Sequence, residues 1–397
     1  MLDRRPAPLT RVAAEKRHGS LGFPSSLSIV MLIASAARQR RSWGPHVVKQ
    51  AYTMSGETVQ NPAASDHGNR LVLLDGWRAL SIIAVLAGHW LPLGPARWQL
   101  NEALAAIGMA LFFTLSGFLI TRLLLRDPHV GRFLIRRIFR IVPLAWLAMV
   151  ILAVVHQADF GTVAANLLFT ANLPPARLME GGQHLWSLCV EMHFYLGVAV
   201  LVALAGRKAV YLVPVLAALV TAGRIAAGET ISIVTWFRVD EILAGATLAL
   251  LLVRIDRPLP LPRWTCLAML VALLASAHPD AGPLAYLRPY FAAMAVGSSL
   301  FAAPALLTKV WTSRPARYVA ETSYAIYVVH GMLTATWLGG ADASKIEKYA
   351  LRPLLLAATM LLAHLSTFYY EKRWIALGRR LAQSPGARTP QSIARAT

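Results

Sequence analysis

The sequence predicts an all-α integral membrane protein: a bundle of about ten transmembrane helices with both termini in the cytoplasm. Three observations support this fold class: 56% of the 397 residues are hydrophobic, only 15% are charged, and the mean hydropathy is +0.52. This composition excludes an ordinary soluble domain and is typical of a polytopic membrane protein. The net charge of +20 is therefore interpreted through membrane topology, and we expect no nucleic-acid partner.

The N-terminal region, residues 1–70, is polar and basic apart from a short apolar patch. We expect a disordered cytoplasmic tail, and we exclude residues 1–53 from the fold because Met54 offers a second start of translation. The transmembrane domain is expected over residues 71–381, with a short cytoplasmic tail over 382–397.

Ten apolar segments follow, each bounded by polar or basic residues. They are expected at residues 75–93, 104–125, 139–156, 186–205, 209–223, 231–253, 264–277, 287–307, 318–338 and 351–371. With a cytoplasmic N-terminus, the inner segments contain most of the 39 Lys and Arg residues. This asymmetry follows the positive-inside rule and supports an even number of spans with both termini in the cytoplasm. The expected localisation is the cytoplasmic (inner) membrane.

The first span contains two ionisable residues, Arg78 and His89. Ionisable groups at membrane depth are costly unless they are paired or line a wet cavity, so each indicates a functional site. Eleven residues make almost three helical turns, which places both side chains on one face, about 16 Å apart along the axis. The alternative is an Arg that reaches the membrane interface and a His that hydrogen-bonds to a neighbouring helix.

The second span contains Ser116, Gly117 and Phe118 near its middle. A glycine there permits close approach of a backbone or a ligand, and the serine hydroxyl offers a polar contact. Packing alone is the alternative interpretation.

A dense basic cluster follows the second span, with Arg136, Arg137 and Arg140 on adjacent turns of a short helix. Arginine forks suit phosphate oxygens. The alternative is an anchor that faces anionic lipid on the cytoplasmic side.

The fourth span begins with His184, Ser187 and Glu191, whose spacing of three and four residues places them on one helix face. The expected topology brings Glu191 to the depth of His89, where the two side chains would pair. A carboxylate bound to one ring nitrogen would orient the imidazole and leave the other nitrogen to act as a base. A purely structural ion pair is the alternative.

Further polar residues lie in the sixth span, where Arg238, Asp240 and Glu241 form either a self-neutralising structural cluster or the lining of a polar channel. Both interpretations remain open. The two cysteines, Cys189 and Cys266, lie within apolar segments, so neither a disulfide framework nor a metal site is expected.

Seven stretches together resemble the acyltransferase family 3 membrane proteins, which O-acylate bacterial surface glycans and related acceptors. In order they read LDGWRALSIIAVLAGH, FFTLSGFLI, RRIFRIVPL, HLWSLCVEMHFYL, FRVDEILAGATLA, ETSYAIYVVH and YYEKRW, and the resemblance extends over residues 74–381. Arg78 and His89 match the family's Arg and His separated by ten residues. The chain departs at Trp77, where Leu is more usual, and at Met192 and His193, where Glu and Gln are common, so the fit of the acceptor stays open.

The resemblance implies an enzyme that transfers an acyl group, commonly acetyl from acetyl-CoA. No metal is expected, because no set of ligands in the sequence has the required spacing. The basic cluster would bind the CoA phosphates at the cytoplasmic mouth, and the pantetheine arm would pass Arg78 on its way to His89. The residues expected to hold the donor are Arg136, Arg137, Arg140, Ser116, Gly117 and Phe118.

The acceptor would be a hydroxyl group of a saccharide, a glycolipid or another glycoconjugate. Of the residues expected to be catalytic, Arg78, His89 and Glu191, we assign His89 as either the general base or a transient acyl carrier. Acceptor contacts are expected from His184, Ser187 and Tyr195.

Two other functions fit parts of the pattern. A proton-coupled transporter or flippase of a lipid-linked saccharide would also need buried His, Glu and Arg along one path. A membrane glycosyltransferase with a polyprenyl phosphate donor would need acidic residues in an outer loop, where the chain offers only Glu102, Asp159 and Glu180. The phosphate-suited Arg cluster and the ordered stretches favour acyl transfer.

Overall fold

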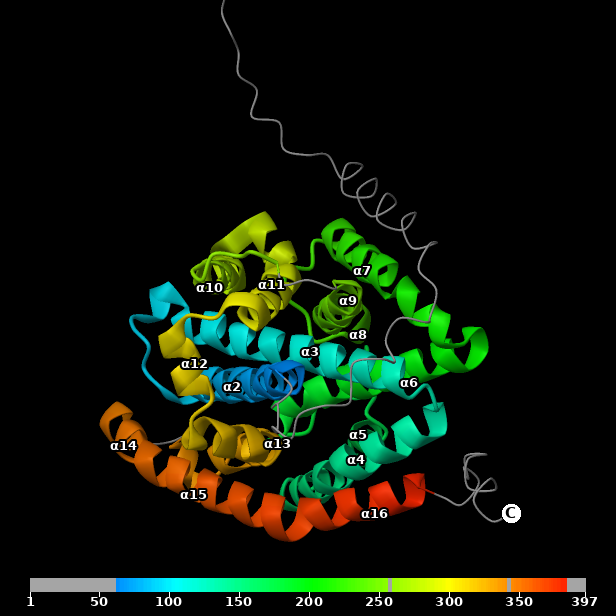
Figure 1. Cartoon of the computed structure of the whole chain (residues 1–397). Coiled ribbons are helices and arrows are strands. Elements are labelled where there is room, and N and C mark those ends of the chain that lie inside the picture. Colours follow the sequence, from blue (N-terminus) through cyan, green and yellow to red (C-terminus); the bar gives the residue numbers. More distant parts are fainter. Residues whose placement is uncertain (1–61, 256–258, 341–343, 384–397) are drawn as a thin grey trace, which may run out of the picture. The chain divides into compact units, whose positions relative to one another are not determined.

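The computed structural model describes residues 62–255, 259–340 and 344–383, and these form helices and connecting loops without a β-strand among them (Figure 1). The expected all-α fold class is confirmed. The sequence predictions for residues 1–53 and for most of the tail after residue 382 lie outside the described residues. The helices are α2 (Pro62–Trp90), α3 (Leu100–Arg126), α4 (Val130–Val155), α5 (Phe160–Leu167), α6 (Trp186–Ala205), α7 (Val213–Ala227), α8 (Thr235–Arg238), α9 (Asp240–Arg254), α10 (Thr265–Ala277), α11 (Arg288–Ala302), α12 (Ala305–Trp311), α13 (Arg314–Thr334), α14 (Lys345–Ala350), α15 (Arg352–Leu365) and α16 (Lys372–Ala382), with a π-helix, η6 (Ser366–Glu371), between the last two.

Each of the ten expected segments overlaps a helix, but fewer helices are long and apolar enough to cross a membrane. Five such spans occur in the described part of the chain: Ala96–Arg126, Val130–Val155, Gln183–Ala205, Arg207–Ala227 and Ile346–Ala382. A sixth results if α11 and α12, which meet at an angle of 102°, count as one span. The chain is thus a multi-pass helical membrane protein, and the number of ten spans stays a prediction.

The basic cluster lies differently from the sequence-based expectation. Arg136, Arg137 and Arg140 belong to the first half of one continuous helix, α4, rather than to a separate short helix. Pro143 lies inside this helix without ending it. The hydroxyls of Tyr324 and Tyr370 donate to the carbonyl oxygens of Ile141 and Pro143, which gives the backbone beside the proline polar partners from other helices.

Helix α2 occupies the middle of the bundle, where it packs along α3 on one side and α13 on the other (Figure 1). Helix α3 in turn packs along α9. This arrangement explains why α2 is apolar on several faces: Leu74, Trp77, Ala84 and Val85 are all buried in helix contacts. The polar residues of α2 therefore face the gaps between its neighbours.

The crossing of α3 and α9 depends on two glycines. A Cβ atom on Gly117 would lie 1.8 Å from the carbonyl oxygen of Ile242, and one on Gly245 would lie 1.9 Å from that of Thr114. Gly117 thus permits a close helix contact, the packing role given above as the alternative, and its assignment to the donor site stays a prediction.

We expect Gly117→Ala to destabilise the protein by about 1–3 kcal/mol, because the added methyl group forces the two backbones apart. The measurement is the thermal unfolding midpoint of the detergent-solubilised protein. Gly197→Ala in α6 is the matched control, since nothing lies within 4 Å of its added Cβ. Equal midpoints for the two variants would contradict the role assigned to Gly117.

Candidate active site

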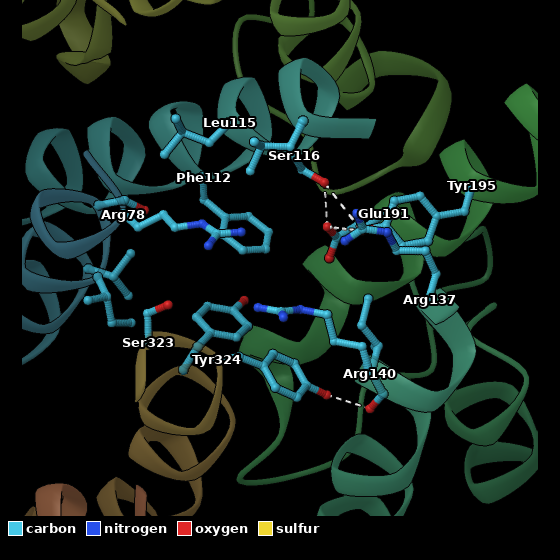
Figure 2. Close-up of a pocket in the computed structure, with 16 residues that line it drawn as sticks. Arg78, Phe112, Leu115, Ser116, Arg137, Arg140, Glu191, Tyr195, Ser323 and Tyr324 are labelled. Atoms are coloured by element: carbon cyan, nitrogen blue, oxygen red, sulfur yellow. Dashed lines mark hydrogen bonds between the residues drawn. The ribbon is translucent and has the colours of Figure 1, made fainter. Parts of the chain in front are cut away.

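A small cavity of about 70 Å³ lies between α2, α3, α4, α6 and α13, and we call it the central cavity (Figure 2). The guanidinium groups of Arg78 from α2 and Arg140 from α4 point into it from opposite sides (Figure 2). Its other polar lining residues are Ser81, Ser116, Arg137, Glu191, Tyr195, Ser323, Tyr324 and Tyr327.

Glu191 organises one wall of the central cavity. Its Oε1 accepts hydrogen bonds from Ser116 Oγ, at 2.5 Å, and from the hydroxyl of Tyr195. The guanidinium carbon of Arg137 lies 5.9 Å from the centre of the Tyr195 ring. Three arginines against one carboxylate leave the cavity positively charged, so it favours an anionic or electron-rich group.

A second, larger cavity of about 760 Å³ adjoins the first, and we call it the basic cavity. It shares Arg78 and Arg140 with the central cavity. Four further cations line it, against three carboxylates, so positive charge is in excess. The additional cations are Arg314, Arg317, Lys372 and Arg379, and the carboxylates are Asp75, Glu321 and Glu371.

A third cavity, of about 950 Å³, contains three imidazoles, and we call it the histidine cavity. It is lined by His89 from α2, His184 from the turn before α6, and His330 from α13. It shares Val85 and Tyr327 with the central cavity. The three cavities therefore form a series, in which helix α2 contributes Arg78 at one end and His89 at the other.

The hydrogen bonds of His89 and His330 assign their protonation. His330 Nδ1 lies 2.6 Å from the carbonyl oxygen of Tyr327, which can only accept, so Nδ1 carries the hydrogen. His330 Nε2 is then an acceptor, and His89 Nδ1 donates to it across 3.1 Å. This leaves the Nε2 atom of His89 unprotonated. Because the His89 side chain is exposed to the cavity, this atom can accept a proton from a bound molecule.

His184 packs against this pair, with ring centres 4.6 Å from His330. Its Nε2 lies 3.1 Å from the carbonyl oxygen of Val328, which places the ring hydrogen on Nε2 and leaves Nδ1 as an acceptor. Gly331 makes room for the ring, since a Cβ there would lie 2.1 Å from His184 Nδ1. His184 thus lines the same cavity as His89 and His330, and its contact with the acceptor stays a prediction.

The expected pairing of His89 with Glu191 is wrong in this structure. Glu191 bonds to Ser116 and Tyr195 in the central cavity, whereas His89 bonds to His330. The reason is the packing of the helices, because α2 lies directly against α13, which brings His330 to His89.

Three other expected site residues, Phe118, Arg136 and Ser187, line none of these three cavities. Phe118 is fully buried in an apolar cluster, and its ring faces the Arg122 guanidinium. Arg136 lines none of the three cavities described above, whereas Arg137 and Arg140 line the central one. Ser187 is fully buried and lies 2.6 Å from the Tyr327 hydroxyl. Tyr195 lies with Glu191 in the central cavity rather than beside the histidines.

The sequence analysis assigned no role to His330 and Tyr327, although both belong to ETSYAIYVVH, one of the stretches that carry the family resemblance. The available signal was their spacing, because residues three apart share a helix face and both belong to a stretch that carries the family resemblance. It also missed Arg314, Arg317 and Arg379, whose positions far apart in the sequence give no sign of a common cavity. Within the described residues, no group of three or more His, Cys, Asp or Glu side chains is arranged to hold a metal ion.

Comparison with known proteins identifies the family. The sequence profile of the family described as an acyltransferase domain matches residues 71–372, which include all three cavities except part of the wall near Ile375 and Arg379. The chain belongs to this acyltransferase family. The matched region includes Arg78, His89 and His330.

Two curated relatives show similarity over shorter stretches. The peptidoglycan O-acetyltransferase OatA of Listeria monocytogenes is 30% identical over 151 residues, which cover 31% of this chain and 22% of the relative. Nodulation protein 10 of Rhizobium leguminosarum bv. viciae is 28% identical over 174 residues, or 37% of this chain and 47% of the relative. The matched stretches thus span less than half of either relative. No solved structure matches this chain.

Proposed function

We propose that this protein is a membrane O-acyltransferase that moves an acyl group, most simply acetyl, from acyl-CoA to a hydroxyl group of a saccharide or glycoconjugate. The observation that carries the proposal is the His89–His330 pair, which leaves an unprotonated nitrogen in the histidine cavity. The central cavity shares lining residues with this cavity and with the basic cavity. Membership of the acyltransferase family supports the reaction class. The name of one relative, a peptidoglycan O-acetyltransferase, supports acetyl as the transferred group and a saccharide as the acceptor class.

The topology that fits this function has ten spans with both termini in the cytoplasm of an inner-membrane protein. The basic cavity then opens to the cytoplasm, in agreement with the positive-inside rule, and the histidine cavity opens to the other side. Acyl-CoA is available in the cytoplasm, so the donor enters at the basic cavity. The acceptor enters at the histidine cavity.

The donor phosphates are bound by the basic cavity in this proposal. Arg140 remains a donor ligand, as the sequence suggests, and is joined by Arg317 and Arg379. Arginine forks bind phosphate oxygens with charge-assisted hydrogen bonds. The pantetheine arm passes between Arg78 and Ser116 through the central cavity and brings the thioester to the boundary at Val85 and Tyr327.

The chemical step uses the Nε2 atom of His89. It accepts the proton of the acceptor hydroxyl while the hydroxyl oxygen attacks the thioester carbonyl carbon. A new C–O bond forms, the C–S bond breaks, and the proton passes from Nε2 to the departing CoA sulfur. His330 Nε2 accepts the hydrogen bond from Nδ1 of the transient imidazolium and so stabilises its charge. Glu191 acts as the counter-charge that positions Ser116, Tyr195 and Arg137 along the donor path.

The experiment that tests the proposal is transfer of radiolabelled acetyl from acetyl-CoA to endogenous glycan or lipid. Membranes that contain the protein are compared with membranes from the same cells without it. We expect labelled product only in the first, and excess unlabelled acetyl-CoA should suppress the label. If no product forms with folded protein in the membrane, the proposal is wrong and the proton-coupled transporter or flippase becomes the better interpretation.

We expect the double variant Arg317→Gln/Arg379→Gln to raise KM for acetyl-CoA by about tenfold, because two charge-assisted contacts to phosphate are lost. The change should leave kcat nearly constant, since neither residue is near the histidines. The matched control is Arg380→Gln, which removes a neighbouring exposed charge of α16 that does not line the cavity. An unchanged KM in the double variant would remove the basic cavity from the donor path.

A further inference from the structure

A buried ionic network adjoins the histidine cavity and is not used in the proposed reaction. It joins Arg224 of α7, Arg238 of α8, Asp240 and Glu241 of α9, and Arg288 of α11, whose side chains are all at most 2% exposed. The network contains three cations and only two carboxylates. Because an unpaired charge is costly in a membrane interior, the location of the excess charge is informative.

Two of the three arginines are closely paired. Arg224 Nη1 lies 2.5 Å from Asp240 Oδ2, and its other nitrogens donate to the carbonyl oxygens of Glu229 and Thr230. Arg288 Nε lies 2.8 Å from Glu241 Oε1. These pairs use both carboxylates.

Arg238 holds the excess charge. Its single ion pair in the described part of the chain is a longer one, 3.4 Å from Nη2 to the Glu241 carboxylate that Arg288 already occupies. Its Nε and Nη1 atoms are buried and have no hydrogen-bond partner among the described residues. Arg238 lines the histidine cavity, and its guanidinium lies 5.5 Å from the ring centre of Trp186, which lines the same cavity.

We propose that Arg238 is the binding residue for an anionic group, a carboxylate or a phosphate, on the acceptor. This inference rests on the proposed function and specifies its substrate class. An anion at Nε and Nη1 would satisfy two buried donors and neutralise the network, and the arginine fork suits both chemical groups. Trp186, which lines the same cavity, offers aromatic surface for contact with a sugar ring. The carboxylates that line the cavity are Glu102 and Glu180, and both are exposed. The buried end of the cavity, where Arg238 lies, is therefore cationic.

The test compares three probes of similar size on the purified protein: methyl glucoside, methyl glucuronide and glucose 6-phosphate. The first readout is ligand-induced thermal stabilisation, which does not depend on acyl transfer. We expect an anionic probe to bind the wild type at least about tenfold more tightly than methyl glucoside. Comparison of glucuronide with the phosphate decides which anion the cavity prefers.

The decisive variant is Arg238→Gln, which leaves two cations against two carboxylates and therefore a balanced network. We expect it to fold and to bind the neutral and anionic probes equally. Arg177→Gln is the matched control, because Arg177 is an exposed arginine paired with Asp159 that does not line the cavity. A wild type without preference, or a preference that persists in Arg238→Gln, would overturn the inference.

The second readout is acetyl transfer from acetyl-CoA to the same probes. If Arg238→Gln loses the preference of KM for anionic probes and retains kcat, the result supports binding of the acceptor by Arg238. Anion binding without transfer to any probe would support the anion site and count against the proposed acyl transfer to such sugars. Transfer with equal KM for neutral and anionic probes would support the enzyme and overturn the anion site.

Discussion

His89→Ala is expected to lower kcat for acetyl transfer by about 10²–10⁴-fold, the usual contribution of a positioned general base. The hydrogen bonds leave His89 Nε2 as the one ring nitrogen of His89 and His330 with a free lone pair. No other nitrogen of these two rings can therefore take the proton of the acceptor hydroxyl. KM for acetyl-CoA should change little, because the donor phosphates are proposed to lie in the basic cavity. The measurement is steady-state transfer at matched protein levels.

His330→Ala should also lower kcat, because His89 Nδ1 then loses the hydrogen-bond partner, His330 Nε2, that keeps the ring hydrogen on Nδ1. The double variant is expected to be no slower than His89→Ala alone, because the two residues act as a unit. His193→Ala is the control: this imidazole of α6 bonds to Thr235 and does not line the histidine cavity. Additive losses in the double variant would contradict the coupled pair.

A transient acyl-imidazole is the alternative role for His89. Purified protein mixed with labelled acetyl-CoA in the absence of acceptor distinguishes the two roles. Label that remains on the wild type but not on His89→Ala would establish the covalent role. Absence of label, together with His89-dependent transfer, agrees with the general base.

Glu241→Gln is expected to have the largest effect on stability, a loss of about 3–5 kcal/mol, which is typical when one partner of a buried ion pair is removed. Glu241 is fully buried and compensates both Arg238 and Arg288. Without its charge, Asp240 would be the one carboxylate left in the network to compensate three buried arginines. The expected observation is a large fall in the thermal unfolding midpoint and in the amount of folded protein recovered from membranes.

Two comparisons make this prediction specific. Glu180→Gln removes a carboxylate that is 75% exposed and lies 3.6 Å from His156, so it should cost less than about 1 kcal/mol. Arg238→Gln balances the network and should be milder than Glu241→Gln, although both lie in the same cluster. If Arg238→Gln were the more damaging variant, the assignment of the excess charge to Arg238 would be wrong.

The buried network also answers a question that the sequence left open. Arg238, Asp240 and Glu241 do not form a self-contained neutral cluster, because Arg224 of α7 pairs with Asp240 and Arg288 of α11 shares Glu241 with Arg238. The sequence therefore identified Arg238, Asp240 and Glu241 as members of a charged cluster, but it did not show which cation pairs with which carboxylate. The pairing depends on side chains that come together only when the helices pack.

The sequence by itself determined the helical membrane class, the positions of the helical segments, and the common face of Arg78 and His89. These follow from local properties, namely hydropathy and the 3.6-residue period, which act within one segment. It also placed Arg140, His89 and His184 among the residues that line the cavities.

The tertiary structure decided the partners. His89 pairs with His330 because α2 packs against α13, and Glu191 turns instead to Ser116 and Tyr195. Gly117 serves the close crossing of α3 and α9, and the basic cavity gathers arginines from helices far apart in the chain. Such contacts depend on how helices cross and rotate against one another. Helix crossings are set by packing over long sequence separations, which the period of a single segment does not encode.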